Sequence, residues 1–473
     1  MNSKRYFATI VLVISSLILG ACAAPAPAPV VEAPAATKAP AATEAPAATE
    51  APAATEAPAA TAIPPVRIDF WTEFAGSEAN DWVNEIAADF SAANPDIEVV
   101  HTGFENTPYL AAVKTAFAGG ATPDLIELNA GGQMFGYAEA DQLLDLTEHI
   151  SANYDGLIRP GIDSFYTLGG KAYAIPLDIS FGNFFFFNTE MFAAQGLDAA
   201  EIKTWDDLLA AAQTFKDAGI VPIAFGNKEG WPGNHIHNHL LHRAVGPEDY
   251  VKMWFRTSDR SVTSDISFAG PEEKQAWDLY KGLLDKGYFT AGYLSDDYVA
   301  STGIFLRGEA PMFTTGSWFI GMIETGAPDL KYEMIAFPTI EGTPGKQTEL
   351  VSAGLVLSIP KESKHIPEAK RFMDYLGSEQ VQEKWSVLGS KMSPYTYDTS
   401  NWAYEPNFKR LAKIVAGSTS AVPFGDILED YACNVPWTWD VSQGILSGDI
   451  TSEAIGAGHE DCITDLVAKK FGN

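Results

Sequence analysis

The chain has 473 residues, with 61 acidic and 31 basic side chains, a formal net charge of −30 and three cysteines. An acidic excess of this size repels nucleic acid, and no basic stripe offsets it, so we exclude a nucleic-acid partner. The length also exceeds what one hydrophobic core comfortably supports, and it predicts two lobes.

Residues 1–21 have the features of a signal peptide. Lys4 and Arg5 precede an apolar run over 7–19, which is shorter than the roughly 20 apolar residues of a membrane-spanning helix. The four residues that end at Cys22 (LGAC) resemble the lipobox of bacterial lipoproteins. This resemblance implies that Cys22 is lipidated and anchors an extracytoplasmic protein to the bacterial cell membrane. The alternative is an ordinary secretory signal with an incidental cysteine.

The residues after the signal peptide predict a tether. From 32 to 61 a six-residue unit, EAPAAT or KAPAAT, repeats without any residue large enough to build a core. Proline at every sixth position blocks helix and favours extended conformations. We therefore expect residues 22–65 to be a disordered Ala/Pro-rich linker that begins at the lipidated cysteine.

The chain beyond the linker alternates strands with helices. The expected elements are a strand (66–71), a helix (81–93), a strand (97–101), a helix capped by Thr107 that ends at Gly119 and Gly120, and a strand (124–128). This βαβαβ order predicts a doubly wound parallel sheet, in which ligands gather beyond the carboxyl ends of the strands. Further on, Thr204 and Asp207 form a capping box for another helix, and 221–225 follows as a strand.

Several segments together resemble one protein family. They include "AFAGGATPDLIELNAG" (116–131), "YAIPLDISFGNFFFFNTEMFAAQGL" (173–197), "FLRGEAPMFTTGSWFI" (305–320) and "SIPKESKHIPEAKRFMDYLGSEQVQEKW" (358–385). Their order and spacing are similar to those of family 1 extracellular solute-binding proteins, the substrate-capturing subunits of ABC importers. The resemblance extends over 66–385.

The resemblance implies an α/β, periplasmic-binding-protein-like fold with two doubly wound lobes, a hinge and a ligand cleft between the lobes. Mapped onto this chain, lobe one takes 66–175 and 316–360, and lobe two takes 188–311 and 361–473. The hinge crossings fall at 176–187 and 312–315. The implied function is a monomeric receptor that hands a sugar to an ABC permease, without a cofactor and without enzymatic activity.

A sugar ring suits a flat aromatic side chain below it and carboxylates or amides at its edge. The resemblance implies ligand-binding side chains at positions matched here by Trp71, Thr72, Glu73, Phe74, Asn129, Gln133, Asp178, Trp231, Trp318, Gly354, Trp437 and Trp439. Five other tryptophans fall within helical patterns and are expected in the core: Trp82, Trp205, Trp254, Trp277 and Trp385. The segments expected at the cleft contain no arginine or lysine, so we expect a neutral mono- or oligosaccharide; they are "FWTEFAG" (70–76), "LNAGGQ" (128–133), "IPLDIS" (175–180), "GWPGN" (230–234), "TTGSW" (314–318) and "SAGL" (352–355). The loop "NAGGQ" lacks the aromatic residue followed by an aspartate that is the maltose-type pattern, and this difference argues against maltose itself.

Other interpretations remain open. His235, His239 and His242 share one face of a predicted helix at a spacing that can bind zinc, but no cysteine or acidic cluster accompanies them, and we expect no metal. Cys433 and Cys462, the two remaining thiols of an exported chain, are expected to form a disulfide. A secreted carbohydrate-active enzyme and an adhesive surface lipoprotein are the alternative functions. The sequence contains no nucleophile elbow, phosphate-binding glycine loop or zincin motif.

Overall fold

The computed structural model describes residues 64–75, 78–182, 184–257, 262–389, 391–404 and 406–472. The signal peptide, Cys22 and almost all of the expected linker lie outside these residues. Within the described part of the chain, no helix is both long and apolar enough to cross a membrane.

The first lobe is built on a five-stranded sheet. Its strand order is β2 (Ile97–Gly103), β1 (Val66–Thr72), β3 (Leu125–Asn129), β13 (Leu355–Ser358) and β6 (Ile175–Pro176). β1 pairs in parallel with β2 and β3, as the βαβαβ pattern predicts, whereas β13 is antiparallel to its neighbours β3 and β6.

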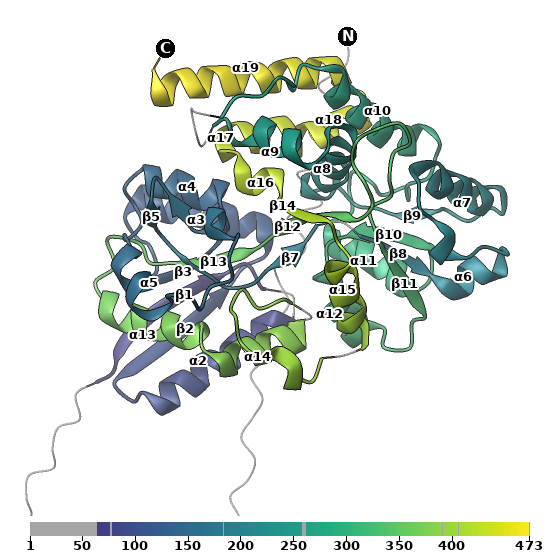
Figure 1. The fold of residues 1–473 in the computed structure, drawn as a ribbon. Helices are drawn as coiled ribbons and strands as arrows, with labels where there is room; N and C mark the ends of the chain where they lie inside the picture. The colour runs from purple at the N-terminus through teal and green to yellow at the C-terminus, as the bar shows by residue number, and fades with distance from the viewer. Residues whose placement is uncertain are drawn as a thin grey trace, which may run out of the picture. The chain divides into compact units, whose positions relative to one another are not determined.

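Helices cover both faces of this sheet, because successive strand residues point to opposite sides. Leu125 packs with one cluster of buried side chains and Ile126 with the other. The helices on the first face are α2 (Glu78–Ala93), α13 (Ile366–Leu376) and α14 (Glu379–Gly389). On the second face they are α3 (Asn106–Gly119) and α4 (Gly132–Glu139), and Figure 1 shows the two groups on either side of β1 and β3.

α3 begins two residues earlier than expected, at Asn106, because its N-cap is Glu105 and not Thr107. Glu105 occupies the N-cap position, and its side chain makes no capping hydrogen bond. Pro108 therefore lies in the first turn, where its missing N–H leaves no hydrogen bond unmade. At the other end, Gly120 adopts a left-handed conformation with φ of 65°, as a helix-terminating glycine should.

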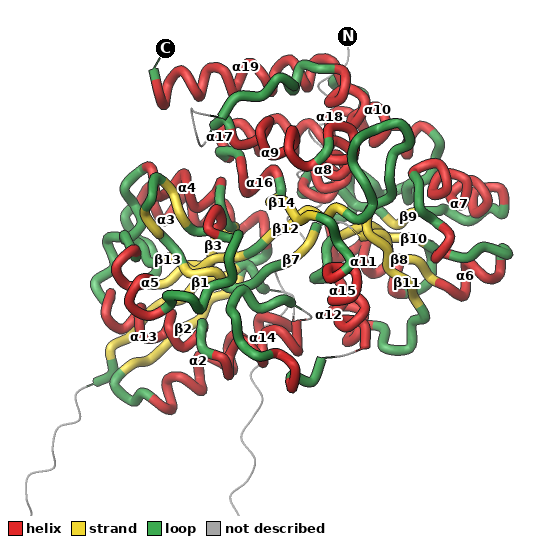
Figure 2. Tube along the Cα trace, in the orientation of Figure 1, coloured by secondary structure: helices red, strands yellow, loops and turns green. Residues whose placement is uncertain are grey.

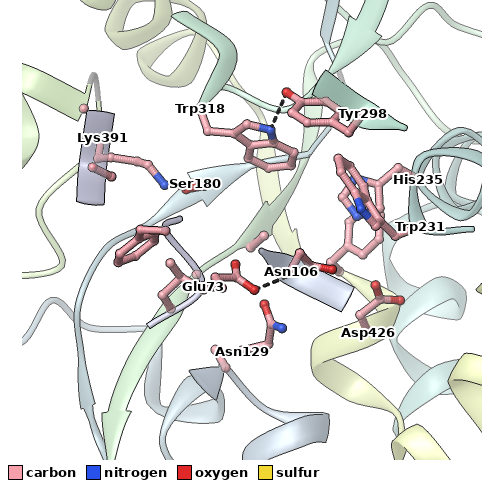
Figure 3. Close-up of a pocket in the computed structure, with 18 of the residues that line it drawn as sticks. Glu73, Asn106, Asn129, Ser180, Trp231, His235, Tyr298, Trp318, Lys391 and Asp426 are labelled. Atoms are coloured by element: carbon pink, nitrogen blue, oxygen red, sulfur yellow. Dashed lines mark hydrogen bonds between the residues drawn. The ribbon is translucent and has the colours of Figure 1, made fainter. Parts of the chain in front are cut away.

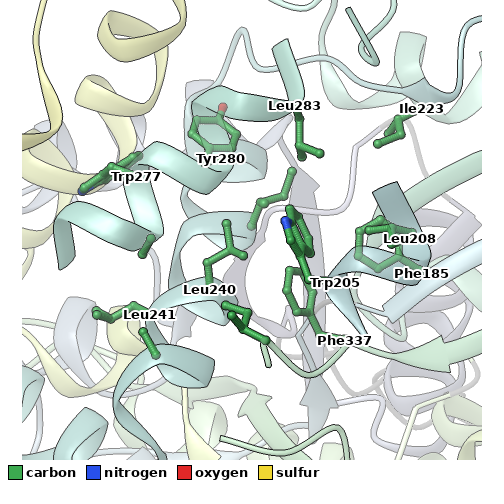
Figure 4. Close-up of a cluster of buried hydrophobic side chains, with 14 of the residues drawn as sticks. Phe185, Trp205, Leu208, Ile223, Leu240, Leu241, Trp277, Tyr280, Leu283 and Phe337 are labelled. Carbon is green, nitrogen blue, oxygen red and sulfur yellow. The ribbon is translucent and has the colours of Figure 1, made fainter. Parts of the chain in front are cut away.

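The second lobe is built on a four-stranded sheet of order β11 (Tyr332–Ala336), β8 (Phe184–Asn188), β10 (Met312–Thr315) and β9 (Ile223–Ala224). The four consecutive phenylalanines of β8 are completely buried because helices cover both faces of this sheet. Figure 4 shows Phe185 together with Trp205, Leu208 and Phe337 on one of these faces. As expected, Thr204 and Asp207 form a capping box at the start of α7.

The helices of the second lobe fall into two groups. Those against the larger core are α6 (Thr189–Ala194), α7 (Trp205–Asp217), α8 (Trp231–Val245), α9 (Pro247–Phe255), α10 (Pro271–Asp285), α18 (Val441–Ser447) and α19 (Ser452–Phe471). Those on the opposite face are α11 (Tyr298–Leu306), α12 (Phe319–Gly326) and α15 (Pro406–Ala416).

A small third sheet links the two lobes. Its order is β14 (Ser420–Pro423), β12 (Glu349–Ala353) and β7 (Ser180–Phe181), and Figure 2 shows it between the two larger sheets. Within the described residues, the chain passes between the lobes near 177–182, then at 348–354 and again at 391–404. The remaining short elements are α5 (Thr147–Asn153), α16 (Gly425–Leu428), α17 (Tyr431–Asn434), the turns η1 (Asp163–Phe165), η2 (Ala199–Glu201) and η3 (Thr399–Asn401), the π-helical turn η4 (Val435–Asp440) and the hairpin of β4 (Thr167–Leu168) and β5 (Lys171–Ala172).

The lobe boundaries differ from the expected ones in three places. Residues 312–315 are no crossing, because β10 pairs with strands of the second lobe on both sides. β11 and α12 also belong to the second lobe, although 316–360 was assigned to the first. Conversely, α13 and α14 pack against the first sheet, although 361–473 was assigned to the second lobe.

A disulfide joins Cys433 of α17 to Cys462 of α19, across 29 positions of sequence. We expect reduction of this bond to lower the free energy of unfolding by about 3 kcal/mol, because a crosslink of this span restricts the unfolded chain. Urea unfolding with and without dithiothreitol measures the difference. A Cys433→Ser, Cys462→Ser double variant is the control, and its unfolding should not respond to the reductant.

Candidate functional site

A cavity of about 320 Å³ lies between the two lobes, beside the small linking sheet. Its walls come from the loop after β1, the carboxyl end of β3, the segment between β12 and β13, and helices of both lobes. The position agrees with the rule that ligands bind beyond the carboxyl ends of parallel strands. Nine aromatic side chains line the cavity: Phe74, Trp82, Trp231, Tyr298, Trp318, Trp385, Phe424, Tyr431 and Trp439.

The second lobe contributes a fixed aromatic wall. Trp231 begins α8, Tyr298 begins α11, and Trp318 follows β10. The indole N–H of Trp318 donates to the Tyr298 hydroxyl at 3.0 Å, and the rings of Trp231 and Tyr298 have centroids 4.8 Å apart. Figure 3 shows these three rings along one side of the pocket. Their mutual contacts hold flat apolar faces in place before any ligand arrives.

The first lobe contributes a second aromatic group. Trp385 of α14 packs on Phe74 and Trp82, with ring centroids 5.2 and 6.3 Å away. Trp82 and Trp385 were expected in the core, and the structure shows that both also line the pocket. Each ring packs against apolar neighbours and also faces the pocket, so the helical spacing of apolar residues does not distinguish a core position from a pocket position.

Glu73 lies at the base of the pocket. Its Oε2 accepts a hydrogen bond from Asn106 Nδ2 at 2.6 Å, and its backbone N–H donates to Glu127 Oε2 at 3.0 Å. Burial raises the pKa of Glu73 to about 7. At neutral pH this carboxyl group can therefore either accept or donate a hydrogen bond to a hydroxyl in the pocket.

Asp426 supplies a second carboxyl group at the side of the pocket near Trp231 (Figure 3). Asn234 Nδ2 donates to its Oδ1 at 2.9 Å, and Trp439 Nε1 donates to its Oδ2 at 3.1 Å. These bonds fix the orientation of both carboxyl oxygens. Burial nevertheless raises the pKa of Asp426 to about 7.

A lysine also reaches the pocket, contrary to the expectation that the cleft contains none. Lys391 belongs to the third crossing, and its Nζ lies 3.0 Å from Oδ2 of Asp178 in the first crossing. Asp178 is completely buried and also accepts from Trp385 Nε1 at 3.3 Å. The Asp178 carboxylate therefore neutralises the charge of Lys391.

Seven of the twelve predicted binding residues line the pocket: Glu73, Phe74, Asn129, Trp231, Trp318, Gly354 and Trp439. Gly354 is required there, because a Cβ would lie 2.5 Å from the Phe165 ring and 2.7 Å from the Asp178 carbonyl oxygen.

The other five predicted residues do not line the pocket and instead support its surroundings. Thr72 is bonded to the His101 ring at 2.7 Å, and Gln133 Oε1 accepts the Asn129 N–H at 2.7 Å. Trp71 packs on Phe104, Trp437 packs over Gly458 of α19, and Asp178 holds Lys391.

Sequence reasoning missed several polar and aromatic groups of the pocket: Asn106, Ser180, Tyr298, Lys391, Asp426 and Tyr431. Most lie on elements far apart in the sequence. A usable signal existed for Asp426, which directly precedes an apolar pair and lies three residues after the end of β14, in the first turn of α16.

The histidines of α8 lie in two environments. His239 and His242 are buried, and His235 faces the pocket between aromatic rings. Burial lowers the pKa of His235 and His239 to about 3, so both rings are neutral. Among the described residues, no group of three or more His, Cys, Asp or Glu side chains is arranged to hold a metal ion.

We expect Asp426→Asn to flatten the pH dependence of stability. The folded protein keeps a proton on Asp426 up to about pH 7, whereas the unfolded chain releases it near pH 4. The free energy of unfolding should therefore fall as the pH rises between these values, by about 1.4 kcal/mol for each unit of pKa difference. Urea unfolding of both proteins at about pH 5 and about pH 8 measures this slope. An unchanged slope in the variant would show that Asp426 titrates normally.

The family model described as bacterial extracellular solute-binding protein matches residues 75–383. An uncharacterised ABC transporter extracellular-binding protein of Pyrococcus horikoshii is 24% identical over 419 residues, which are 85% of this chain and 83% of that protein. A multiple sugar-binding protein of Streptococcus mutans is 25% identical over 334 residues, 69% of this chain and 75% of that protein.

Solved structures agree with the fold. A structure from work on xylan utilization by the thermophilic bacterium Caldanaerobius polysaccharolyticus has a TM-score of 0.75 and 25% identity, and the match covers 84% of this chain and 99% of that chain. A chitin oligosaccharide binding protein also has a TM-score of 0.75, with 22% identity and coverage of 85% and 99%. The two-lobed arrangement is thus shared with both of these proteins.

Proposed function

Since the chain belongs to the bacterial extracellular solute-binding proteins, we propose that it binds a neutral mono- or oligosaccharide in the pocket and delivers it to an ABC import permease. The observation that carries this proposal is the combination of tryptophan faces from both lobes with carboxyl and amide groups at their edges. Aromatic faces suit the C–H surface of a pyranose, and the polar groups suit its hydroxyls. Relatives named for multiple sugars and for arabinooligosaccharides support the same ligand class.

The charges of the pocket favour a neutral ligand. Among the described residues, Lys391 is the only lysine or arginine that lines it, and it is engaged by Asp178. Three acidic side chains line the same cavity: Glu73, Glu105 and Asp426. A phosphate or carboxylate ligand would meet these groups without a free cation to bind it.

A thermal-shift screen of the purified protein tests the proposal. The panel contains neutral mono- and oligosaccharides, polyols, sugar phosphates and uronates, and hits are confirmed by calorimetric titration. We expect neutral saccharides to raise the unfolding temperature. Stabilisation by the anionic sugars alone would contradict a neutral ligand, and stabilisation by none of the panel would contradict saccharide binding.

The same titration separates a receptor from an enzyme. A receptor releases its ligand unaltered, so chromatography of the saccharide after prolonged incubation should recover only the starting compound. Product formation with turnover would instead indicate a carbohydrate-active enzyme.

We also propose that a lipid on Cys22 holds the receptor at the outer surface of the cell membrane, where the permease is reached. The chain is expected to act as a monomer. Cys22→Ala should move the protein from the membrane fraction to the soluble fraction of the expressing cells. Retention of the variant on the membrane would contradict lipid anchoring at this residue.

A further inference from the structure

Glu127 is a buried acid directly behind the pocket that the binding site does not use. It is the third residue of β3, and the parallel pairing of Trp71 with Ile126 places it beside the end of β1. Its side chain is completely buried, and its Oε2 accepts the backbone N–H of Glu73 at 3.0 Å. Glu127 therefore supports the loop that carries Glu73 into the pocket.

The surroundings of Glu127 hold more negative groups than positive ones. Three carboxyl groups, those of Glu73, Glu127 and Asp178, share one nearby ammonium group, and that group on Lys391 lies against Asp178. The titratable groups that act on Glu127 or respond to it are Glu73, Tyr109, Tyr431, Asp178 and Lys391. Because the tyrosines add no positive charge, no cation among the described residues pairs with Glu127 itself.

The second carboxyl oxygen of Glu127 has no partner. Oε1 is buried and makes no hydrogen bond with any of the described residues. An ionised carboxylate in such a position would lose its hydration without compensation, whereas a protonated one carries no net charge.

We propose that Glu127 is a positioning residue that stays protonated at neutral pH, holds the Glu73 loop through one oxygen, and leaves Glu73 available to accept hydrogen bonds from the ligand. Burial and the nearby Glu73 carboxyl raise the pKa of Glu127 well above its ordinary value, which agrees with the geometry. The role in ligand binding rests on the proposed saccharide receptor function, whereas the proton on Glu127 does not.

Two substitutions separate the role of the hydrogen bond from that of the charge. Glu127→Ala removes the acceptor for the Glu73 N–H, and we expect it to weaken binding of the best saccharide from the screen about tenfold. Glu127→Gln keeps one acceptor oxygen without a titratable proton, and it should recover most of that loss. Glu273→Ala is the matched control, because Glu273 is equally buried but bonds to His237 and Trp277 away from the pocket. An affinity of Glu127→Ala equal to that of wild type would overturn the positioning role.

Two further measurements need no ligand. Amide hydrogen exchange of residues 71–75 should be faster in Glu127→Ala than in Glu127→Gln. The urea midpoint of the wild-type full chain should fall between about pH 5 and about pH 8 more than that of Glu127→Gln, because only the wild type keeps a proton there that its unfolded form has released. Equal falls in the two proteins would show that Glu127 is ionised and would overturn the proposal. If no saccharide binds the wild type, the receptor function fails, while the exchange and unfolding results still decide the state of Glu127.

Discussion

Lys391→Met is expected to lower the free energy of unfolding by about 3 to 5 kcal/mol, because it leaves Asp178 buried without its cation. Asp178 is completely buried, and the Lys391 side chain is only 14% exposed, so solvent screens the pair weakly. The ion pair also joins the first crossing between the lobes to the third. Loss of the pair should therefore loosen both segments where they meet the pocket.

Urea unfolding measures this loss, and Lys384→Met provides the control. Lys384 is on α14 and pairs with Glu85 at 2.8 Å, but the Glu85 side chain is 62% exposed. Such a surface pair contributes roughly 1 kcal/mol or less. Adding Asp178→Asn to Lys391→Met should recover part of the stability, since it removes the stranded charge. A Lys391→Met variant no less stable than Lys384→Met would show that Asp178 finds another partner.

Much of the first lobe follows from local sequence signals. The alternation of strands and helices over 66–128 predicted the parallel pairing of β1, β2 and β3, because each βαβ unit closes on residues nearby in the chain. In the second lobe, the capping box of Thr204 and Asp207 could likewise be predicted from residues close together in the sequence. Glu73, which directly follows the first strand, could therefore be placed at the pocket from local signals, whereas Trp318 was placed there by the family resemblance.

The lobe assignment of the later segments could not be predicted in this way. α13 carries an amphipathic pattern that fits the surface of either lobe, and nothing within it indicates which sheet its apolar face covers. After the second crossing, the chain leaves the first lobe again only at the third crossing, which contains Lys391, and α13 and α14 precede it. The Pro and Ser residues of 391–400 indicate a loop there, but no local pattern indicates that the loop passes from one lobe to the other.

The tryptophans show a related limit. Trp277 and Trp385 both lie at helical spacing among apolar residues, yet Trp277 packs in the larger core and Trp385 lines the pocket. Both side chains are nearly inaccessible, so burial alone does not separate them either. The difference depends on which element lies opposite each ring, and that is a property of the assembled fold.

Trp318→Ala is expected to weaken saccharide binding about tenfold or more, because a stacked ring contributes on the order of 1 to 2 kcal/mol. The ring lines the pocket over Gly316, where a Cβ would lie 2.0 Å from it, and it is held by the hydrogen bond to Tyr298. The ring is only partly buried, so its removal leaves a smaller cavity than truncation of a core tryptophan. The ligand-induced change in tryptophan fluorescence should also be smaller in the variant.

Trp277→Ala is the control for Trp318→Ala. Trp277 is completely buried and stacks on His237 with centroids 3.7 Å apart, so its truncation should cost about 3 to 5 kcal/mol of stability. Its effect on affinity should be small as long as the protein remains folded, since it does not line the pocket. We therefore expect Trp318→Ala to lose mainly affinity and Trp277→Ala to lose mainly stability. If Trp318→Ala bound normally and unfolded as early as Trp277→Ala, the ring of Trp318 would be a structural element and the sugar would stack elsewhere, with Trp231 and Trp439 the next rings to replace.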